Sequence, residues 1–281
     1  MEIIKNYSNS LSIADMHTHS EYSHDSQCKI EDMCLSQIEK GTNIFAVTDH
    51  FDTASYMDYD VFTPIKSSYD TVKKLNMKYA GKCKILTGVE ISEGFWHKDI
   101  LEKITKMLPY DVIIGSVHLV KYKELTMAYS RINFSKLPQN IVEEYLNQYF
   151  DDILTMFDTT DFDILAHLTC PLRYIEGKFK FNINLDLFED KIMTILKRTV
   201  NEEKALEVNT SSYGVLNDFM PTIDIIKKYR DLGGKLITLA SDAHIKQNAS
   251  VDFNMAIEAL KKLGFESLCY YENRKPVEYK I

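Results

Sequence analysis

A short apolar run ends in two histidines one residue apart at Ile13-Ala14-Asp15-Met16-His17-Thr18-His19-Ser20. Side chains alternate with a period of two along a β-strand, so a strand places His17 and His19 on one face. A helix would turn them about 200° apart. Two imidazoles on one face can chelate a divalent metal ion. This stretch therefore predicts a strand that ends at a metal site.

The same pattern of an apolar run with a polar end recurs along the chain. Six further runs have strand length and end in a polar group, at 44–50, 84–90, 110–118, 162–167, 205–209 and 235–244. Helix-like segments lie between them, at 29–40, 64–80, 99–107, 140–157, a stretch ending near 200, 221–232 and 251–263. The stretch 121–137 has no clean period, and we expect it to be a functional loop.

Seven strands alternating with helices predict a parallel sheet, because parallel connections need crossovers. The polar strand ends come from all seven strands, whereas an open sheet would carry them only beside its topological switch point. We therefore expect a closed or nearly closed α/β barrel with its site at the carboxyl ends of the strands. No repeat or linker divides the chain, so residues 1–281 are expected to form a single domain.

Composition narrows the class of protein. The chain has 281 residues, with 41 acidic against 33 basic and a net charge of −8. This balance lacks the basic footprint of nucleic-acid binding. No apolar stretch approaches the ~20 residues that span a bilayer, so no membrane insertion is expected. Five cysteines without paired C-x-x-C spacing, and no signal peptide, predict reduced thiols in a cytoplasm.

The polar strand ends supply mostly nitrogen and oxygen donors, namely His17, His19, Asp49, His50, Glu90, His118, His167, Asn209, Asp242 and His244. Zinc, manganese and iron all accept mixed imidazole and carboxylate ligands, so the residues do not choose among them. Calcium and magnesium prefer oxygen shells and fit this set less well.

Six motifs in order resemble those of the PHP (polymerase and histidinol phosphatase) superfamily. They are His17-Thr18-His19, Thr48-Asp49-His50, Gly88-Val89-Glu90, Gly115-Ser116-Val117-His118, Asp163-Ile164-Leu165-Ala166-His167 and Ser241-Asp242-Ala243-His244. The length and the sequence Glu207-Val208-Asn209-Thr210-Ser211 are most similar to the stand-alone histidinol-phosphate phosphatases of that superfamily. The resemblance implies a distorted seven-stranded (β/α)7 TIM-like barrel with two to three divalent zinc, manganese or iron ions.

The resemblance also implies a set of ligands for each metal. One metal would be held by His17, His19, Glu90 and Asp242. A second would share Glu90 and add His118 and His167. A third would take His50, His244 and a ligand from the loop 22–26, where we favour Asp25 and keep the adjacent His24 as the alternative.

The resulting hypothesis is phosphomonoester hydrolysis, most similar to the histidinol-phosphatase step of histidine biosynthesis, by a metal-bridging hydroxide. Glu90 would bridge the metals, and Asp242 or His244 would protonate the departing alkoxide. Arg173 would grip the phosphate bidentately, with Arg131 as a second candidate.

Two further residues have alternative roles. His24 would contact substrate or lie free at the rim, and Asn209 would contact substrate or cap a turn.

Two other functions stay open on the sequence. Other superfamily members suggest a nuclease or an enzyme acting on another small phosphate such as a nucleotide, although the acidic balance opposes a nucleic-acid groove. A binding module with structural metals is the non-catalytic alternative. Structural sites, however, are usually closed four-ligand sets rich in cysteine, whereas the histidines of this chain gather at an open barrel mouth. The sequence does not predict an oligomeric state.

Overall fold

The computed structural model describes residues 13–55 and 60–281. Its main sheet is parallel and runs in the order β1-β2-β4-β5-β6-β7-β8, with β3 paired to β4. The strands are β1 (Ala14–Asp15), β2 (Ile44–Val47), β3 (His50–Asp52), β4 (Lys84–Ser92), β5 (Val112–Ser116), β6 (Ile164–Leu165), β7 (Ala205–Asn209) and β8 (Ile237–Ala240). The predicted seven-stranded α/β barrel is confirmed, because β2 and β3 pair with successive parts of β4 and the eight strands therefore occupy seven positions.

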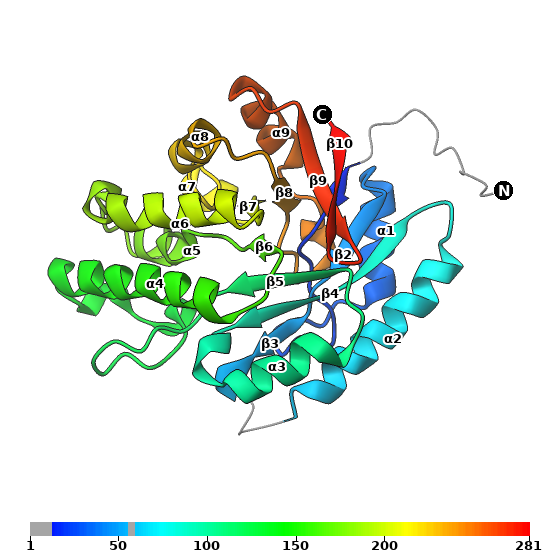
Figure 1. Ribbon diagram of the computed structural model, residues 1–281, viewed down its shortest axis with the longest axis horizontal. Coiled ribbons are helices and arrows are strands. Elements are labelled where there is room, and N and C mark those ends of the chain that lie inside the picture. Colours follow the sequence, from blue (N-terminus) through cyan, green and yellow to red (C-terminus); the bar gives the residue numbers. More distant parts are fainter. Residues whose placement is uncertain (1–12, 56–59) are drawn as a thin grey trace.

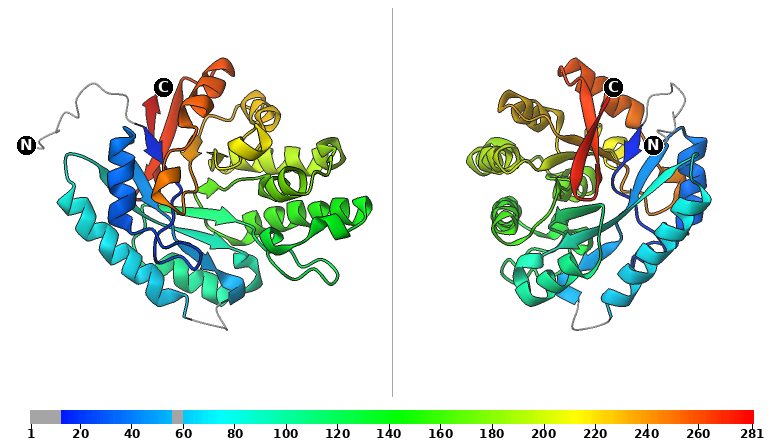
Figure 2. Two further views of the ribbon diagram at one scale, coloured as in Figure 1. Left: turned by 180° about the vertical axis from the view of Figure 1, so that it is seen from behind. Right: turned by 45° about the vertical axis from the view of Figure 1, so that its right-hand side comes forward.

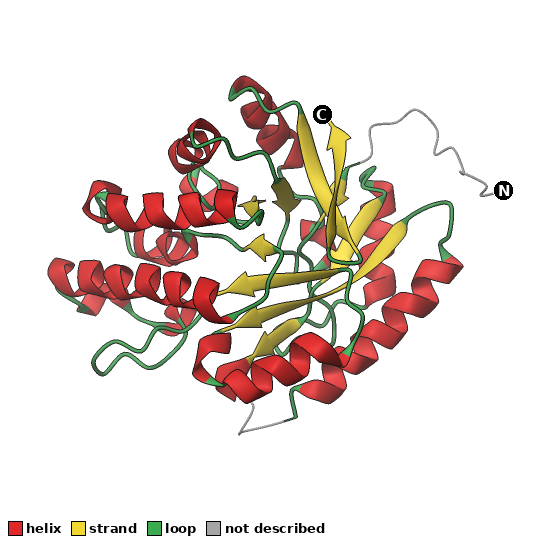
Figure 3. Cartoon of the chain, in the orientation of Figure 1, coloured by secondary structure: helices red, strands yellow, loops and turns green. Residues whose placement is uncertain are grey.

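Helices surround the strands (Figures 1 and 3). The longer ones are α1 (Ile30–Glu39), α2 (Phe62–Lys78), α3 (Lys98–Met107), α4 (Gln139–Thr159), α6 (Glu189–Asn201), α8 (Ile223–Asp231) and α9 (Phe253–Lys262), and the short ones are α5 (Cys170–Leu172) and α7 (Tyr213–Leu216). In α4 the buried Val142, Tyr145, Tyr149 and Ile153 recur at three- and four-residue spacing. Such a stripe packs one helix face on the sheet. None of the helices in the described residues is long and apolar enough to cross a membrane.

The barrel closes between its first and last strands. The Met16 N–H donates to Leu239 O at 2.8 Å, the Asp242 N–H to His17 O at 2.9 Å, and the His19 N–H to Ala243 O at 3.0 Å. These bonds continue beyond β1 and β8 into the segments that carry the predicted ligands. Closing the barrel therefore brings the His17-x-His19 and Asp242-x-His244 pairs side by side.

An antiparallel hairpin that the sequence pattern did not predict crosses the amino-terminal end of the barrel (Figure 2). It consists of β9 (Ser267–Glu272) and β10 (Lys275–Lys280). Its turn reaches the start of β5, where the Arg274 N–H donates to Asp111 O. From β9, Cys269 and Tyr271 pack in one buried cluster with the inward residues of the strands. The hairpin thus closes the amino-terminal end of the barrel, and the carboxyl ends of the strands stay open.

The stretch 121–137 contains irregular chain with two 3₁₀ turns, Tyr129–Arg131 and Phe134–Lys136. Its Tyr129 is 3% exposed and its Phe134 is fully buried. A loop anchored by two buried aromatic side chains has a fixed path. Tyr129 is thereby held at the carboxyl end of the barrel, beside the predicted site.

Candidate metal centre

A pocket of about 160 Å³ opens at the carboxyl ends of the strands. Most of the predicted site residues line it, and Tyr129 and Tyr174 form an aromatic wall. The full lining is His24, Asp25, His50, Asp52, His118, Ala128, Tyr129, Ser130, His167, Cys170, Arg173, Tyr174, Asp242 and His244. His17, His19 and Glu90 lie directly beneath, each 1% exposed or less. The sequence pattern thus brings its donors to one place, since parallel strands share the edge at which they end.

Glu90, near the end of β4, lies at the centre of this cluster. One carboxylate oxygen, Oε1, lies 3.1 Å from His118 Nε2 and 3.1 Å from His167 Nε2. The other, Oε2, lies 3.2 Å from His17 Nε2 and 2.8 Å from His50 Nδ1. Burial raises the pKa of Glu90, but the surrounding histidines outweigh it and hold that pKa well below its ordinary value. Glu90 is therefore ionised, as a metal ligand must be.

Asp242 joins the cluster from the turn after β8. Its Oδ1 lies 3.2 Å from His19 Nε2 and 3.9 Å from His17 Nε2. Asp242 has a φ of 51° and His167 a φ of 21°, both in the left-handed region that non-glycine residues rarely adopt. Residues with such strained backbones are found mainly at functional sites, where the surrounding structure holds them in place.

Asp25 and His24 occupy different places despite being adjacent. Asp25 Oδ1 lies 3.5 Å from His50 Nε2, and its Oδ2 lies 3.2 Å from His244 Nε2. His24 is directed toward Asp52, with its Nδ1 3.5 Å from Asp52 Oδ2 and its side chain 42% exposed. The geometry supports Asp25 as the third-metal ligand, and the assignment stays a prediction.

Three buried ring nitrogens, His17 Nε2, His19 Nε2 and His50 Nδ1, surround Glu90 Oε2 at 3.2, 3.6 and 2.8 Å, but none of the four atoms has a hydrogen bond of normal geometry. Buried polar atoms normally form such bonds, so four that contact one another without them are arranged as ligands around a metal ion would be. The histidines and acids also form compact candidate metal groups, among them His17 with His19 and Asp242. Nitrogen and carboxylate oxygen are donors that zinc, manganese and iron accept. The residues therefore fit divalent transition metals.

The predicted substrate contacts differ in their surroundings. Arg173 lines the pocket, and its Nη1 donates to Ser211 Oγ at 3.1 Å. Arg131 is exposed and lies outside the pocket lining. Asn209 is fully buried and donates from Nδ2 to Glu207 Oε1 at 2.9 Å. Its position supports a role in holding the site together, and it gives no support to substrate contact.

Glu207 had no predicted role, although its side chain is fully buried beside the cluster. Its Oε2 lies 2.8 Å from His17 Nδ1. The only sequence signal is an acid inside an apolar strand, which burial makes costly unless it is paired.

Asp49 lies between β2 and β3 and is not part of the pocket lining. Both its oxygens accept hydrogen bonds from serines, including Ser20 Oγ at 2.8 Å and Ser23 Oγ at 2.7 Å. Ser23 Oγ in turn lies 3.2 Å from His19 Nδ1. Asp49 therefore acts on a candidate ligand only through a serine.

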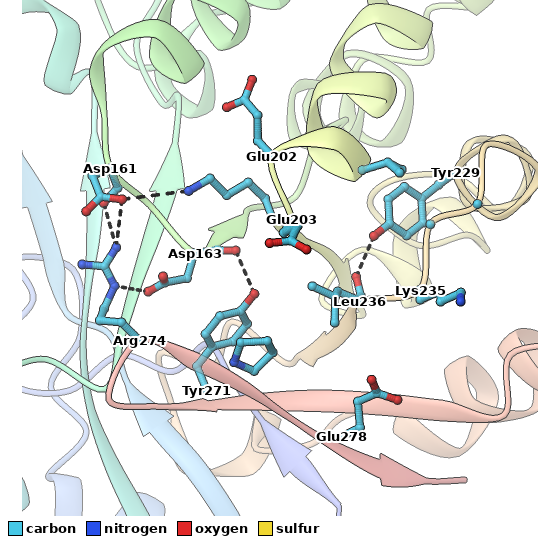
Figure 4. A pocket seen from close by; sticks show the side chains of 15 residues that line it. Asp161, Asp163, Glu202, Glu203, Tyr229, Lys235, Leu236, Tyr271, Arg274 and Glu278 are labelled. Carbon is cyan, nitrogen blue, oxygen red and sulfur yellow. Dashed lines mark hydrogen bonds and ion pairs between the residues drawn. The ribbon is translucent and has the colours of Figure 1, made fainter.

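A larger pocket, of about 830 Å³, lies at the amino-terminal end of the barrel (Figure 4). Tyr271 and Arg274 of the hairpin line it together with Asp161 and Asp163, which pair with Arg274. None of the predicted site residues lies there. Size alone therefore does not identify the functional site of this molecule.

Similar folds occur among solved structures. A crystal structure of histidinol phosphate phosphatase from Lactococcus lactis, complexed with zinc, L-histidinol and phosphate, superposes with a TM-score of 0.74. The match has 24% sequence identity and covers 95% of this chain and 100% of that one. A crystal structure of the "putative histidinol phosphatase" from Listeria monocytogenes superposes with a TM-score of 0.72. That match has 15% sequence identity and covers 86% of this chain and 99% of the Listeria chain. At these identities the likeness establishes the barrel fold.

Sequence relatives match over almost their whole length. A protein of Thermotoga maritima named "Probable histidinol-phosphatase" is 31% identical over 270 residues, covering 95% of this chain and 99% of the relative. The "Histidinol-phosphatase" of Lactococcus lactis is 26% identical, covering 93% of this chain and 95% of the relative. The model of the PHP domain matches residues 15–211, which include all the predicted ligands except Asp242 and His244. This chain therefore belongs to the PHP domain family.

Proposed function

We propose that this protein is a metal-dependent phosphomonoesterase that hydrolyses L-histidinol phosphate to L-histidinol and phosphate. The observation that carries the proposal is that the nine predicted ligands, six histidines and three carboxylates, lie in or directly beneath one pocket that Arg173 also lines. Relatives named histidinol-phosphatase support L-histidinol phosphate as the substrate, since they match this chain over almost its whole length.

Three groups of residues would hold the metals. His17, His19, Glu90 and Asp242 would hold one, Glu90 with His118 and His167 a second, and Asp25 with His50 and His244 a third. Bound divalent metals would supply Lewis acidity that activates water and neutralises charge on phosphate oxygens. The zinc in the Lactococcus structure favours zinc among the three metals considered.

The protein's own residues would orient the substrate. Arg173 can donate two N–H groups to a phosphate dianion, and Ser211 fixes its guanidinium at the pocket wall. The departing alkoxide needs a proton. Asp242 and His244 are the residues predicted for this role, but both are also proposed ligands, and a ligand binds a metal in its deprotonated form. His244 is 30% exposed, so the pocket is open to solvent, which would supply the proton instead. The buried Tyr129 lines the pocket on the side of the loop 121–137 and lies edge-on to His118, so its ring would shield that side of a bound substrate from water.

Phosphate release from L-histidinol phosphate, adenosine monophosphate and 4-nitrophenyl phosphate tests this function. The purified protein is stripped of metal and reloaded separately with zinc, manganese or iron(II). We expect kcat/KM for L-histidinol phosphate to exceed kcat/KM for adenosine monophosphate and for 4-nitrophenyl phosphate by at least about a hundredfold. Faster phosphate release from adenosine monophosphate would show that the substrate is a nucleotide and not L-histidinol phosphate. Full activity of the stripped protein in excess chelator would refute the metal mechanism.

A further inference from the structure

Glu207 uses both carboxylate oxygens inside the barrel. Besides the 2.8 Å contact of Oε2 with His17 Nδ1, Oε1 accepts hydrogen bonds from the His167 N–H at 3.1 Å and from Asn209 Nδ2 at 2.9 Å. The side chain is 0% exposed, so these partners replace water entirely. One carboxylate from β7 thus contacts candidate ligands that follow two other strands, β1 and β6.

The contact with His17 determines which ring nitrogen is free. A carboxylate beside Nδ1 holds the proton of a neutral imidazole on that atom, which leaves the Nε2 lone pair for a metal. His17 Nε2 is the atom that faces Glu90 and has no hydrogen-bond partner. Glu207 therefore fixes both the tautomer and the direction of the ring.

The contact with His167 acts on the backbone. The His167 φ of 21° is an unfavourable conformation for histidine, and its N–H points to Glu207 Oε1. A buried acceptor at this N–H stabilises the turn that directs the ring toward Glu90. Loss of the acceptor would leave both the strain and an unpaired donor.

Asn209 extends the network toward the phosphate side. Its Nδ2 also lies 3.4 Å from Asp242 Oδ2, and its Oδ1 accepts from Ser211 Oγ at 2.7 Å. Ser211 Oγ is the group that holds Arg173. The bonds therefore connect His17 through Glu207 and Asn209 to Asp242 on one side and Arg173 on the other.

We propose that Glu207 and Asn209 are positioning residues that orient the metal ligands His17, His167 and Asp242 and, through Ser211, the arginine. The inference rests on the proposed metal centre. Glu207 could instead be a ligand itself, since it forms a candidate group with His17 and His167. Its Oε2, however, lies on the Nδ1 side of His17, the opposite ring nitrogen from the one that faces Glu90.

The test measures zinc binding without substrate, so it is independent of which phosphate ester the enzyme hydrolyses. Glu207→Gln keeps the shape of the side chain but removes the charge that holds the Nδ1 proton. We expect zinc affinity, measured by competition with a chromophoric chelator, to fall about 10–100-fold. At saturating zinc the number of bound ions should equal that of the natural protein. Asp152→Asn on α4, remote from the pocket, is the matched control and should bind zinc normally.

Two outcomes for Glu207→Gln would overturn the proposal. One zinc fewer at saturation in Glu207→Gln would make Glu207 a ligand. Natural zinc affinity with lowered stability of the metal-free protein would make it merely structural. If Glu207→Gln does not fold, Asn209→Ala decides, because it leaves the carboxylate in place. Asn209→Ala should weaken zinc binding and raise KM for phosphate esters together, and unchanged values of both would refute the network.

Discussion

Arg173 brings a permanent positive charge to a pocket otherwise walled by histidines, carboxylates and aromatic rings. Arg173→Ala should raise KM for L-histidinol phosphate about 10–100-fold, because a hydrogen bond to a charged group contributes about 1.5–3 kcal/mol. Metal content should not change, since the guanidinium ligates nothing. Steady-state kinetics and elemental analysis measure the two effects. Arg131→Ala removes an exposed arginine outside the pocket and serves as the control, and equal kinetics for both variants would contradict the role.

The loop ligand of the third metal can be decided by counting ions. Asp25 lies between His50 and His244, whereas His24 points to Asp52. Asp25→Ala should lose one bound metal and most turnover, because a carboxylate both ligates and neutralises the ion. His24→Ala should keep the full metal count. Loss of a metal from His24→Ala alone would show that the loop is assigned one residue out of register.

At the scale of elements, the barrel strands and longer helices were predictable because their patterns are local. The run 44–48 is apolar and of strand length, and α4 repeats its apolar residues at helical spacing. The hairpin β9–β10 was not predicted, because Tyr271 faces a core built from distant strands, and β10 is largely exposed. Glu207 was overlooked for the same reason: its partners His17 and His167 are 190 and 40 residues away.

The hairpin is expected to stabilise the barrel through Tyr271. Its ring is 2% exposed, and its hydroxyl donates to Asp163 O at 3.2 Å. Tyr271→Ala should lower the free energy of unfolding by about 3 kcal/mol or more, since a large cavity forms. Tyr271→Phe keeps the ring and should cost only about 1 kcal/mol. Urea unfolding of metal-free protein measures both, and equal losses would mean that the hydroxyl, not the ring, stabilises the hairpin.

Helix α4 contains a carboxyl that makes stability depend on pH. Burial raises the pKa of Asp152 from 3.8 to about 6, while Gln148 partly opposes this. The folded chain therefore binds this proton more tightly than the unfolded chain, and the stability it contributes at low pH is lost as pH rises from 3.8 to about 6. Asp152→Asn should stabilise the protein by about 1–2 kcal/mol at pH 7 and lose that advantage below pH 4. A constant difference across this range, measured by urea unfolding, would contradict the buried-acid explanation.

For the whole molecule, the two ends of the barrel differ in their chemistry. The hairpin closes the amino-terminal end with apolar side chains such as Cys269 and Tyr271. The carboxyl end gathers histidines around Glu90, with several donor atoms left without a hydrogen-bond partner. The apolar packing at the amino-terminal end is complete once the chain folds, whereas the polar atoms around Glu90 would gain their full set of partners only when an ion binds. The stability of the fold should therefore be linked to metal.

Removal of metal tests this link. A ligand that binds only the folded state at a thousandfold excess over its Kd stabilises that state by about 4 kcal/mol. Each kcal/mol shifts Tm by about 2 °C in a chain of this size. Chelation should therefore lower Tm by about 8 °C, and added zinc should restore it. Glu90→Gln, which removes the carboxylate proposed to be shared by two metals, should respond less than the natural protein. An unchanged Tm after chelation, with elemental analysis showing that the metal has left, would mean that the barrel mouth is stable without ions.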